Sequence, residues 1–245
     1  MATHEEEMLA ENRRIEGEAR RDRDKGGGTV WIGGAPGAAA GEWRPVAASA
    51  YTATPASTSR ITMSDTSDLS VGQAIRYTYD GVTYYGVVAA ISADAYIDVA
   101  GAPLDTGHDL TALEYAGPAH VIQIEFQIVK ASFGATATDL LNTIMKTAFR
   151  WRLGVAYLVG FSGKLKTADG TTNPKINVTV DGDSVSTNDT NNGIQPTASW
   201  VDNSAVAIST ANYGLANLST VGIKCTVAGG TTGSDLTVSC VFVLE

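Results

Sequence analysis

Residues 76–88, RYTYDGVTYYGVV, contain four tyrosines around one Asp-Gly pair. An Asp-Gly pair between two runs of β-forming residues indicates a two-residue hairpin turn with positive φ at its centre. The cross-strand pairs that follow from this turn are Tyr79 with Val82, Tyr77 with Tyr84, and Ile75 with Gly86. The stretch therefore predicts an antiparallel hairpin.

The register of this hairpin also divides its side chains between two faces, because alternate residues of a strand point to opposite sides. The more apolar face carries Ile75, Tyr77, Tyr79, Val82, Tyr84 and Val88. We expect this face to be the core side of a small sheet, since half-buried tyrosine is common in sheets. Tyr85 lies on the other face, opposite Arg76, and is the one tyrosine expected at the surface as a candidate for stacking on a ligand.

The sequence around the hairpin predicts a mainly β protein with two β units. Residues 58–117 hold about five short strand-like segments separated by turn signals, which predicts a small closed or half-closed β-barrel. Residues 118–245 alternate apolar segments with polar loops, which predicts an antiparallel β-sandwich of the jelly-roll type. One short helix is expected there over residues 140–151, where apolar residues recur at helical spacing after Thr138 and Asp139.

Residues 1–57 are expected to form a polar helix and an extended anchoring arm. The first 25 residues hold 14 of the 43 charged residues, and residues 5–25 are rich in helix formers. Met8 and Ile15 do not make a sustained apolar stripe, so the helix has no face to bury in its own domain. Two interpretations stay open: a solvated tail, or a helix that orders against a partner through Met8 and Ile15.

The arm, residues 26–50, is dense in Gly and Ala and contains Trp31 and Trp43. It has neither helical nor strand periodicity, which is typical of an extended segment. Buried tryptophan commonly anchors an interface, whereas an exposed indole on a flexible arm is unfavourable. We therefore expect both indoles to dock on a neighbouring chain or on the chain's own barrel.

The charge of the chain argues against nucleic acid as a partner. The net charge is −9 with a pI near 4.8, and no basic patch lies outside the N-terminal tail. No apolar stretch reaches the length that spans a bilayer, and the acidic N-terminus is unlike a secretory signal. We therefore expect no membrane partner and synthesis in the cytoplasm.

The two cysteines, Cys225 and Cys240, lie in apolar segments on either side of one loop. If these segments form a hairpin, the two thiols face each other and a disulfide is one alternative. In a reducing compartment, we favour two buried thiols that act as small apolar residues.

The titratable residues do not converge in the pattern of an active site, so we expect no enzymatic activity, cofactor or metal. The histidines His4, His108 and His120 stand apart, and none lies three or four residues from another. The loop around Asp181 and Asp183 is rich in carboxylates and amides but has no distal Glu, so a turn is a better interpretation than a calcium loop.

Glycan sites combine exposed aromatic side chains with polar groups, and Trp200 is the best candidate for such a residue. It follows the polar loop NNGIQPTAS, and Tyr213 and Tyr157 are the other aromatic candidates in the sandwich. The alternative for Trp200 is that its indole covers the end of the sandwich.

The order of polar helix, Gly/Ala arm, small barrel and terminal sandwich resembles structural proteins of tailed-bacteriophage virions. Residues 60–91, RITMSDTSDLSVGQAIRYTYDGVTYYGVVAAI, are similar to small barrel modules of such proteins. Residues 174–185, PKINVTVDGDSV, and 233–245, GSDLTVSCVFVLE, are similar to their C-terminal sandwiches. Members of this class commonly form trimers on capsids or tails, so the resemblance implies assembly into a virion.

Two functions compete on this basis. The first is a capsid decoration or head-fibre protein, a homotrimer whose residues 1–57 grip other virion proteins and whose β units stand outside. The alternative is a tail or fibre component that binds a host-surface glycan through its sandwich. In both cases the expected location is the virion, after synthesis in the host cytoplasm.

Overall fold

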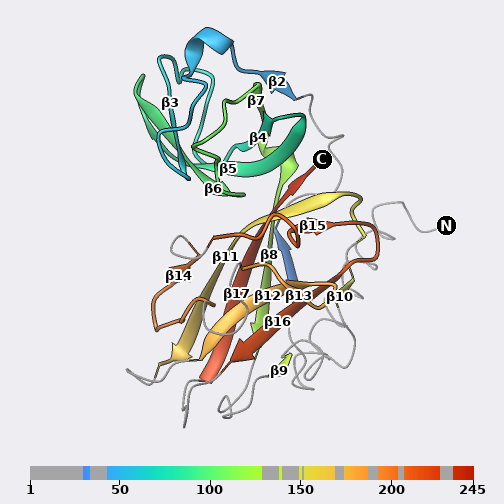
Figure 1. Ribbon diagram of the computed structural model, residues 1–245. Coiled ribbons are helices and arrows are strands. Elements are labelled where there is room, and N and C mark those ends of the chain that lie inside the picture. The colour runs from blue at the N-terminus through green and yellow to red at the C-terminus, as the bar shows by residue number, and fades with distance from the viewer. Residues whose placement is uncertain are drawn as a thin grey trace, which may run out of the picture.

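The computed structural model of the chain describes residues 30–33, 43–128, 138–139, 149–150, 152–168, 174–186, 193–203, 207–226 and 234–245. Within these ranges the strands form three sheets with antiparallel pairing. Figure 1 shows one sheet as a small unit at one end of a sandwich made by the other two. The prediction of a mainly β protein is confirmed.

The small unit is a six-stranded sheet in the order β2, β7, β4, β5, β6, β3. The bounds are Arg44–Pro45 for β2, Ala112–Ala116 for β7, Ala74–Tyr79 for β4, Val82–Ser92 for β5, Tyr96–Gly101 for β6 and Arg60–Thr62 for β3. Because β2 pairs with β7, strand pairing starts this unit at Arg44 rather than at residue 58.

Two short 3-10 helices, η1 (Ala48–Ala50) and η2 (Pro118–His120), flank the strands of this unit. In the described ranges no helix is long and apolar enough to cross a membrane.

The hairpin at Asp80-Gly81 forms with the predicted register, which pairs Tyr79 with Val82, Tyr77 with Tyr84, and Ile75 with Gly86. Asp80 and Gly81 have φ values of 47° and 79°, as this turn requires. Tyr77 and Tyr79 are buried in the core, as predicted. Val82 is on the same face but is exposed, because it lies at the hairpin tip beyond the core.

The small unit is an open barrel. Its edge strands β2 and β3 are not paired with each other in the part of the chain that the structure describes. A bridge between Tyr51 and Met63 fastens the segment that follows β2 to the end of β3. β5 carries a bulge between Val88 and Ala90 and bends across the unit (Figure 1). The described strands form no closed barrel, so that one of the two predicted alternatives is wrong.

Tyr85 is buried, with 3% of its surface exposed, and the prediction of a surface tyrosine that stacks on a ligand is wrong. The register does place it on the face opposite Tyr77 and Tyr79. That face is not exposed to solvent, because the sandwich packs against it through Tyr157. Alternation within the hairpin cannot predict that a segment distant in sequence covers one of its faces.

The sandwich consists of two sheets. The first runs in the order β1 (Val30–Gly33), β8 (Val121–Ile128), β17 (Ser234–Leu244), β11 (Ala156–Thr167) and β14 (Val201–Asp202). β15 (Gly214–Leu215) is also paired to β11. The second runs in the order β10 (Phe149–Arg150), β16 (Thr220–Thr226), β12 (Lys175–Val180) and β13 (Asp183–Ser184). β9 (Thr138–Asp139) is also paired to β16.

The connectivity of the sandwich is that of a jelly roll. β9 and β10 share the partner β16, and β14 and β15 share the partner β11, so each couple fills one strand position. We number the eight strand positions along the chain, from β8 as one to β17 as eight. The order across the first sheet is then one, eight, three, six, and the order across the second is two, seven, four, five. Two Greek keys arranged in this way define the jelly roll. The predicted sandwich type is confirmed, and β1 adds an edge strand beside β8.

The structure differs from two smaller predictions, the hairpin between the cysteines and the helix cap at Thr138 and Asp139. β16 and β17 belong to different sheets, so they do not form the hairpin that was one premise for a disulfide between Cys225 and Cys240. Cys240 is a buried free thiol, and the side chain of Cys225 lies outside the described residues. Thr138 and Asp139, expected to cap a helix, lie in a strand instead, as does Phe149 near its expected end. Residues 140–148 lie outside the described ranges.

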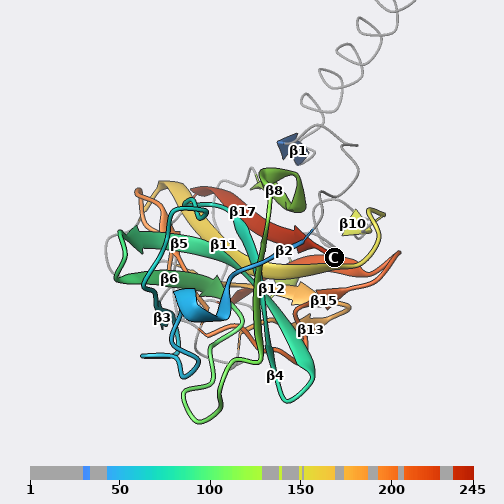
Figure 2. The ribbon, with the colours of Figure 1, turned by 90° about the horizontal axis from the view of Figure 1, so that it is seen from above.

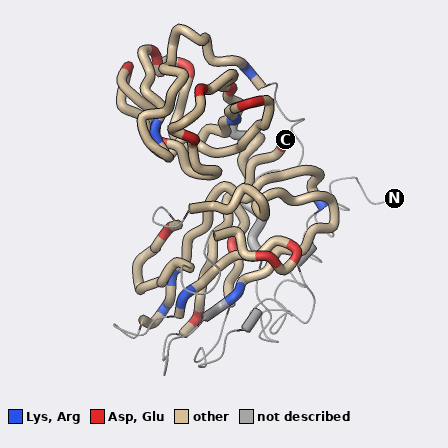
Figure 3. Tube along the Cα trace, in the orientation of Figure 1, with Lys and Arg blue, Asp and Glu red and all other residues tan. Residues whose placement is uncertain are grey.

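The buried side chains of the small unit and of the sandwich form one continuous hydrophobic cluster. Figure 2 shows β5 and β6 lying over β11, which agrees with the contacts between these strands. Figure 3 shows several Lys and Arg residues near the end of the sandwich that is remote from the small unit. The sandwich therefore has two ends: the junction end, where it shares a core with the small unit, and the opposite, distal end.

Candidate functional site

The six residues predicted to bind partners or ligands fall in different places. Met8 and Ile15 lie outside the described residues. Trp31 is in β1, where its backbone pairs in register with Glu125 of β8. Trp43 and Tyr85 lie at the junction, and Trp200 lies at the distal end. The described candidates outside β1 therefore fall at two places, the junction and the surface around Trp200.

The junction is built on a stack of tyrosines. The ring of Tyr85 lies 3.9 Å from that of Tyr157, with 8° between the planes, and Tyr157 in turn contacts Tyr213 at 5.0 Å. Tyr213 and Tyr157, named above as possible glycan-binding aromatics, both belong to the junction: Tyr213 is buried, with 4% of its surface exposed, and Tyr157 is partly buried against the core. The stack joins the two β units.

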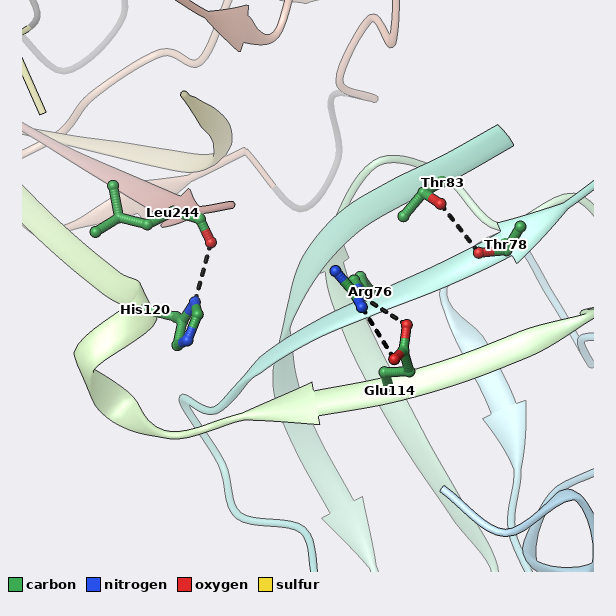
Figure 4. Close-up of polar contacts among 6 residues, drawn as sticks. All are labelled: Arg76, Thr78, Thr83, Glu114, His120 and Leu244. Atoms are coloured by element: carbon green, nitrogen blue, oxygen red, sulfur yellow. Dashed lines mark hydrogen bonds and ion pairs between the residues drawn. The ribbon is translucent and has the colours of Figure 1, made fainter. Parts of the chain in front are cut away.

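Trp43 covers the edge of this stack on its own chain. Its ring lies 6.1 Å from that of Tyr85 and 4.8 Å from that of His120. The guanidinium of Arg76 lies over the indole at 4.7 Å, and its Nε and Nη2 bond the Glu114 carboxylate at 2.6 and 3.0 Å (Figure 4). Of the two docking alternatives for Trp43, this placement matches contact with the chain's own barrel.

The last residues of β17 end in the same place. Nδ1 of His120 lies 3.1 Å from the carbonyl oxygen of Leu244 (Figure 4), and the N–H of Glu245 donates to the carbonyl of Val155 at 3.2 Å. Burial raises the pKa of Tyr85, and the Glu245 carboxylate adds to the rise. The raised pKa follows from the same burial that makes Tyr85 part of the junction core.

The surface around Trp200 lies on the outer face of the first sandwich sheet. The N–H of Leu165 donates to the carbonyl of Thr197 at 2.8 Å, and Val201 pairs with Gly163. These two attachments to β11 hold the short loop that carries Trp200. Residue 200 then stands beside Lys164, and side chains of neighbouring residues in adjacent strands point to the same face.

Trp200 and its neighbours line an open hollow of about 580 Å³. Trp200 is 47% exposed, although tryptophan is usually well buried. The other lining residues are Glu125, Gln127, Ile128, Lys164, Lys166, Ala198, Asp235, Leu236 and Thr237. Lys166 and Asp235 form an ion pair at 3.4 Å across the rim. About half of the indole surface is buried, so the alternative that Trp200 covers the sandwich end stands beside that of a binding residue.

The hollow is remote from the junction. Tyr157 and Lys164 are seven residues apart on β11, which corresponds to about 23 Å along a strand. The sequence pointed to Trp200, but the polar residues around it come from β8, β11 and β17, and no local motif joins these strands.

The Asp181 loop and the isolated His108, both considered in the sequence, are explained by hydrogen bonds within the chain. Asp181 accepts from Ser219 Oγ at 2.8 Å and from the N–H of Thr220 at 2.7 Å, so its carboxylate anchors a turn. His108 bonds Asp105 at 2.7 Å, and this contact raises the pKa of the histidine. The described residues contain no cluster of three or more His, Cys, Asp or Glu suited to a metal ion.

Comparison with known proteins leaves the chain without an assigned family. No family model and no curated protein matches it. Among solved structures, the major capsid protein P2 of bacteriophage PM2 is similar at a TM-score of 0.25 and 10% identity, over 89% of this chain and 98% of that one. The structure of infectious bursal disease virus Gx strain has a TM-score of 0.25 and 12% identity, over 89% and 70% of the two chains.

A third solved structure, BuGH86 in complex with neoagarooctaose, has a TM-score of 0.22 and 14% identity, over 80% of this chain and 34% of that one. At TM-scores of 0.25 or below, these likenesses carry no inference about the function of this chain.

Proposed function

We propose that the chain is a non-enzymatic structural protein of a virion, a capsid decoration or head-fibre component. The observation that carries the proposal is the jelly-roll connectivity of the sandwich, an architecture that builds viral capsid domains and lectin domains. A fold by itself does not define function. The resemblance of the whole sequence order to structural proteins of phage virions supplies the second support.

The organisation of the chain suits display on a particle. The two β units share one core through the stack of Tyr85 and Tyr157, so they behave as a single stiff body. The charged segment, residues 1–29, is joined to this body through β1, which occupies an edge of the first sandwich sheet. In this proposal that segment grips other virion proteins through residues such as Met8 and Ile15, and the chain assembles as a homotrimer.

A truncation tests the anchoring role. Deletion of residues 1–29 keeps β1 and Trp43, so the truncated chain should keep the near-ultraviolet circular dichroism spectrum and the melting temperature of the full chain. The full chain should have the mass of a trimer by light scattering. In cells that supply the chain from a plasmid and are infected by a virus from which the gene for this chain has been deleted, the full chain should enter particles and the truncated chain should not.

A full-length control separates anchoring contacts from length. The double variant Met8→Asp, Ile15→Asp keeps the segment and changes two apolar contacts, and it should enter particles several-fold less well. If the truncated chain enters particles as efficiently as the full chain, the anchoring role is wrong. A full chain that stays monomeric at all concentrations contradicts the trimer.

A further inference from the structure

We infer that the hollow beside Trp200 is a binding site for a neutral oligosaccharide. This site lies at the distal end of the sandwich and does not depend on the proposed structural role. The first support is the exposure of the indole. Trp200 leaves 47% of its surface open, and its loop is fixed to β11 on both sides, by Leu165 and by Gly163. A fixed, half-exposed indole presents a flat apolar surface at little entropic cost.

The second support is the row of polar groups beside the indole. Lys164, Thr237 and Gln127 are cross-strand neighbours on β11, β17 and β8, so they form one line across the sheet. In the described part of the chain, the side chains of Lys164 and Gln127 form no hydrogen bond or ion pair. A sugar hydroxyl is both a hydrogen-bond donor and an acceptor. The amide of Gln127, the ammonium of Lys164 and the carboxylate of Glu125 offer partners for both roles. Polar groups of this kind next to an apolar wall are the usual composition of a ligand site.

The third support is the charge of the lining, which selects the class of ligand. Lys164 and Lys166 carry positive charge and Glu125 and Asp235 carry negative charge, so the formal charges cancel. Lys166 is already paired with Asp235. A lining whose charges cancel gives an acidic sugar no net attraction, and the chain's net charge of −9 repels sialylated sugars, sulfated sugars and nucleotides alike. A neutral sugar avoids this repulsion, and its ring can pack on the indole.

The test uses the full chain and two steps. The first is an array of neutral oligosaccharides built from glucose, galactose and N-acetylglucosamine, with their sialylated and sulfated counterparts. We expect binding to neutral members and weaker binding to the acidic counterpart of each. The second is titration of the tightest neutral oligosaccharide by calorimetry or saturation-transfer NMR.

Variants locate the site. Trp200→Ala should lower the affinity about tenfold. Gln127→Ala leaves the indole in place and should lower it about threefold to tenfold. Val71→Ala removes an exposed apolar side chain of the small unit and should leave the affinity unchanged. Circular dichroism of each variant checks that it is folded. If Trp200→Ala does not fold, Gln127→Ala still tests the site.

Four results would overturn the inference. They are no binding to any neutral oligosaccharide, tighter binding to the acidic members, unchanged affinity in the folded Trp200→Ala and Gln127→Ala variants, and a change in oligomeric mass in Trp200→Ala. The last result would make the hollow an interface between copies of the chain.

Discussion

Tyr85 of the small unit and Tyr157 of the sandwich stack face to face, with their ring centroids 3.9 Å apart and their planes within 8° of each other. Each ring belongs to a different sheet, so this contact fixes how the two units lie against each other. Tyr213 and Trp43 extend the aromatic cluster on either side. The junction therefore has the composition of a core and not of a mobile domain interface.

The first prediction concerns the stack itself. Tyr85→Ala should lower the free energy of unfolding by about 3–5 kcal/mol, because it removes a fully buried ring between two sheets. Tyr85→Phe keeps the ring and should cost about 1 kcal/mol. Tyr84→Ala is the matched control, since Tyr84 is the adjacent residue and is only partly buried on the opposite face.

Urea unfolding measures these differences, and small-angle scattering measures the separation of the units. Tyr85→Ala should increase the radius of gyration, whereas Tyr84→Ala should not. If Tyr84→Ala costs as much stability as Tyr85→Ala and leaves the same shape, the stack does not hold the units together.

The local part of the fold could be predicted from the sequence. The Asp80-Gly81 turn fixed the register of β4 and β5, and alternation along β4 placed Tyr77 and Tyr79 on the core side. These features depend on residues close in sequence, where turn chemistry and alternation determine the outcome.

The non-local part could not be predicted in the same way. Tyr85 is buried by Tyr157, which is 72 residues further along the chain, and Thr138 and Asp139 join a strand because they pair with Lys224 and Cys225. In the hollow, the exposed position of Trp200 after a polar loop was a usable signal. Its polar neighbours come from three strands that only the jelly-roll topology brings together.

The second prediction compares two arginines with the same local arrangement. Arg76 forms two hydrogen bonds to Glu114, and its guanidinium stacks on the ring of Trp43. Arg60 likewise forms two hydrogen bonds to Asp98 and stacks on the ring of Tyr96. Arg76→Lys should cost about 1–2 kcal/mol, because lysine loses both the bidentate geometry and the stacking.

Arg60→Lys should cost less, because the Arg60 side chain is 41% exposed and that of Arg76 is 26% exposed. Urea unfolding of both variants, side by side, measures the difference. Equal losses would mean that the junction adds nothing to the Arg76 pair.

The third prediction is a loss of stability at high pH. Burial raises the pKa of Tyr79 to about 12 and raises those of Tyr85 and Tyr213 above the ordinary value of 10. The folded chain therefore holds these protons more tightly than the unfolded chain. Their contribution to stability is fully present below about pH 10 and falls as the pH rises toward 12.

Tyrosinate absorbance and urea midpoints across this range measure the effect. In Tyr79→Phe the fall in stability between about pH 10 and pH 12 should be shallower than in the parent chain, whatever the stability at neutral pH. A parallel slope in the two proteins would show that Tyr79 titrates normally in the folded state.

The fourth prediction concerns the glycine pair that lets β6 approach the sandwich. Gly101 faces Gly86 across β5 and β6 and has a φ of +134°. A Cβ at Gly101 would lie 2.7 Å from the Gly86 Cα and from the Tyr85 carbonyl oxygen, and 3.3 Å from the Val159 Cβ. These are backbone or first side-chain atoms, which cannot rotate away, so Gly101→Ala should cost about 2–4 kcal/mol and displace Tyr85.

Gly72→Ala is the control for backbone strain alone. Gly72 also has a positive φ, +83°, but no atom lies within 4 Å of its added Cβ. Its substitution should cost about 1 kcal/mol. Urea unfolding gives both values, and the near-ultraviolet spectrum of the aromatic cluster reports whether Tyr85 has moved. If the two variants lose the same stability and keep the same spectrum, the close approach at Gly101 is not what positions the junction.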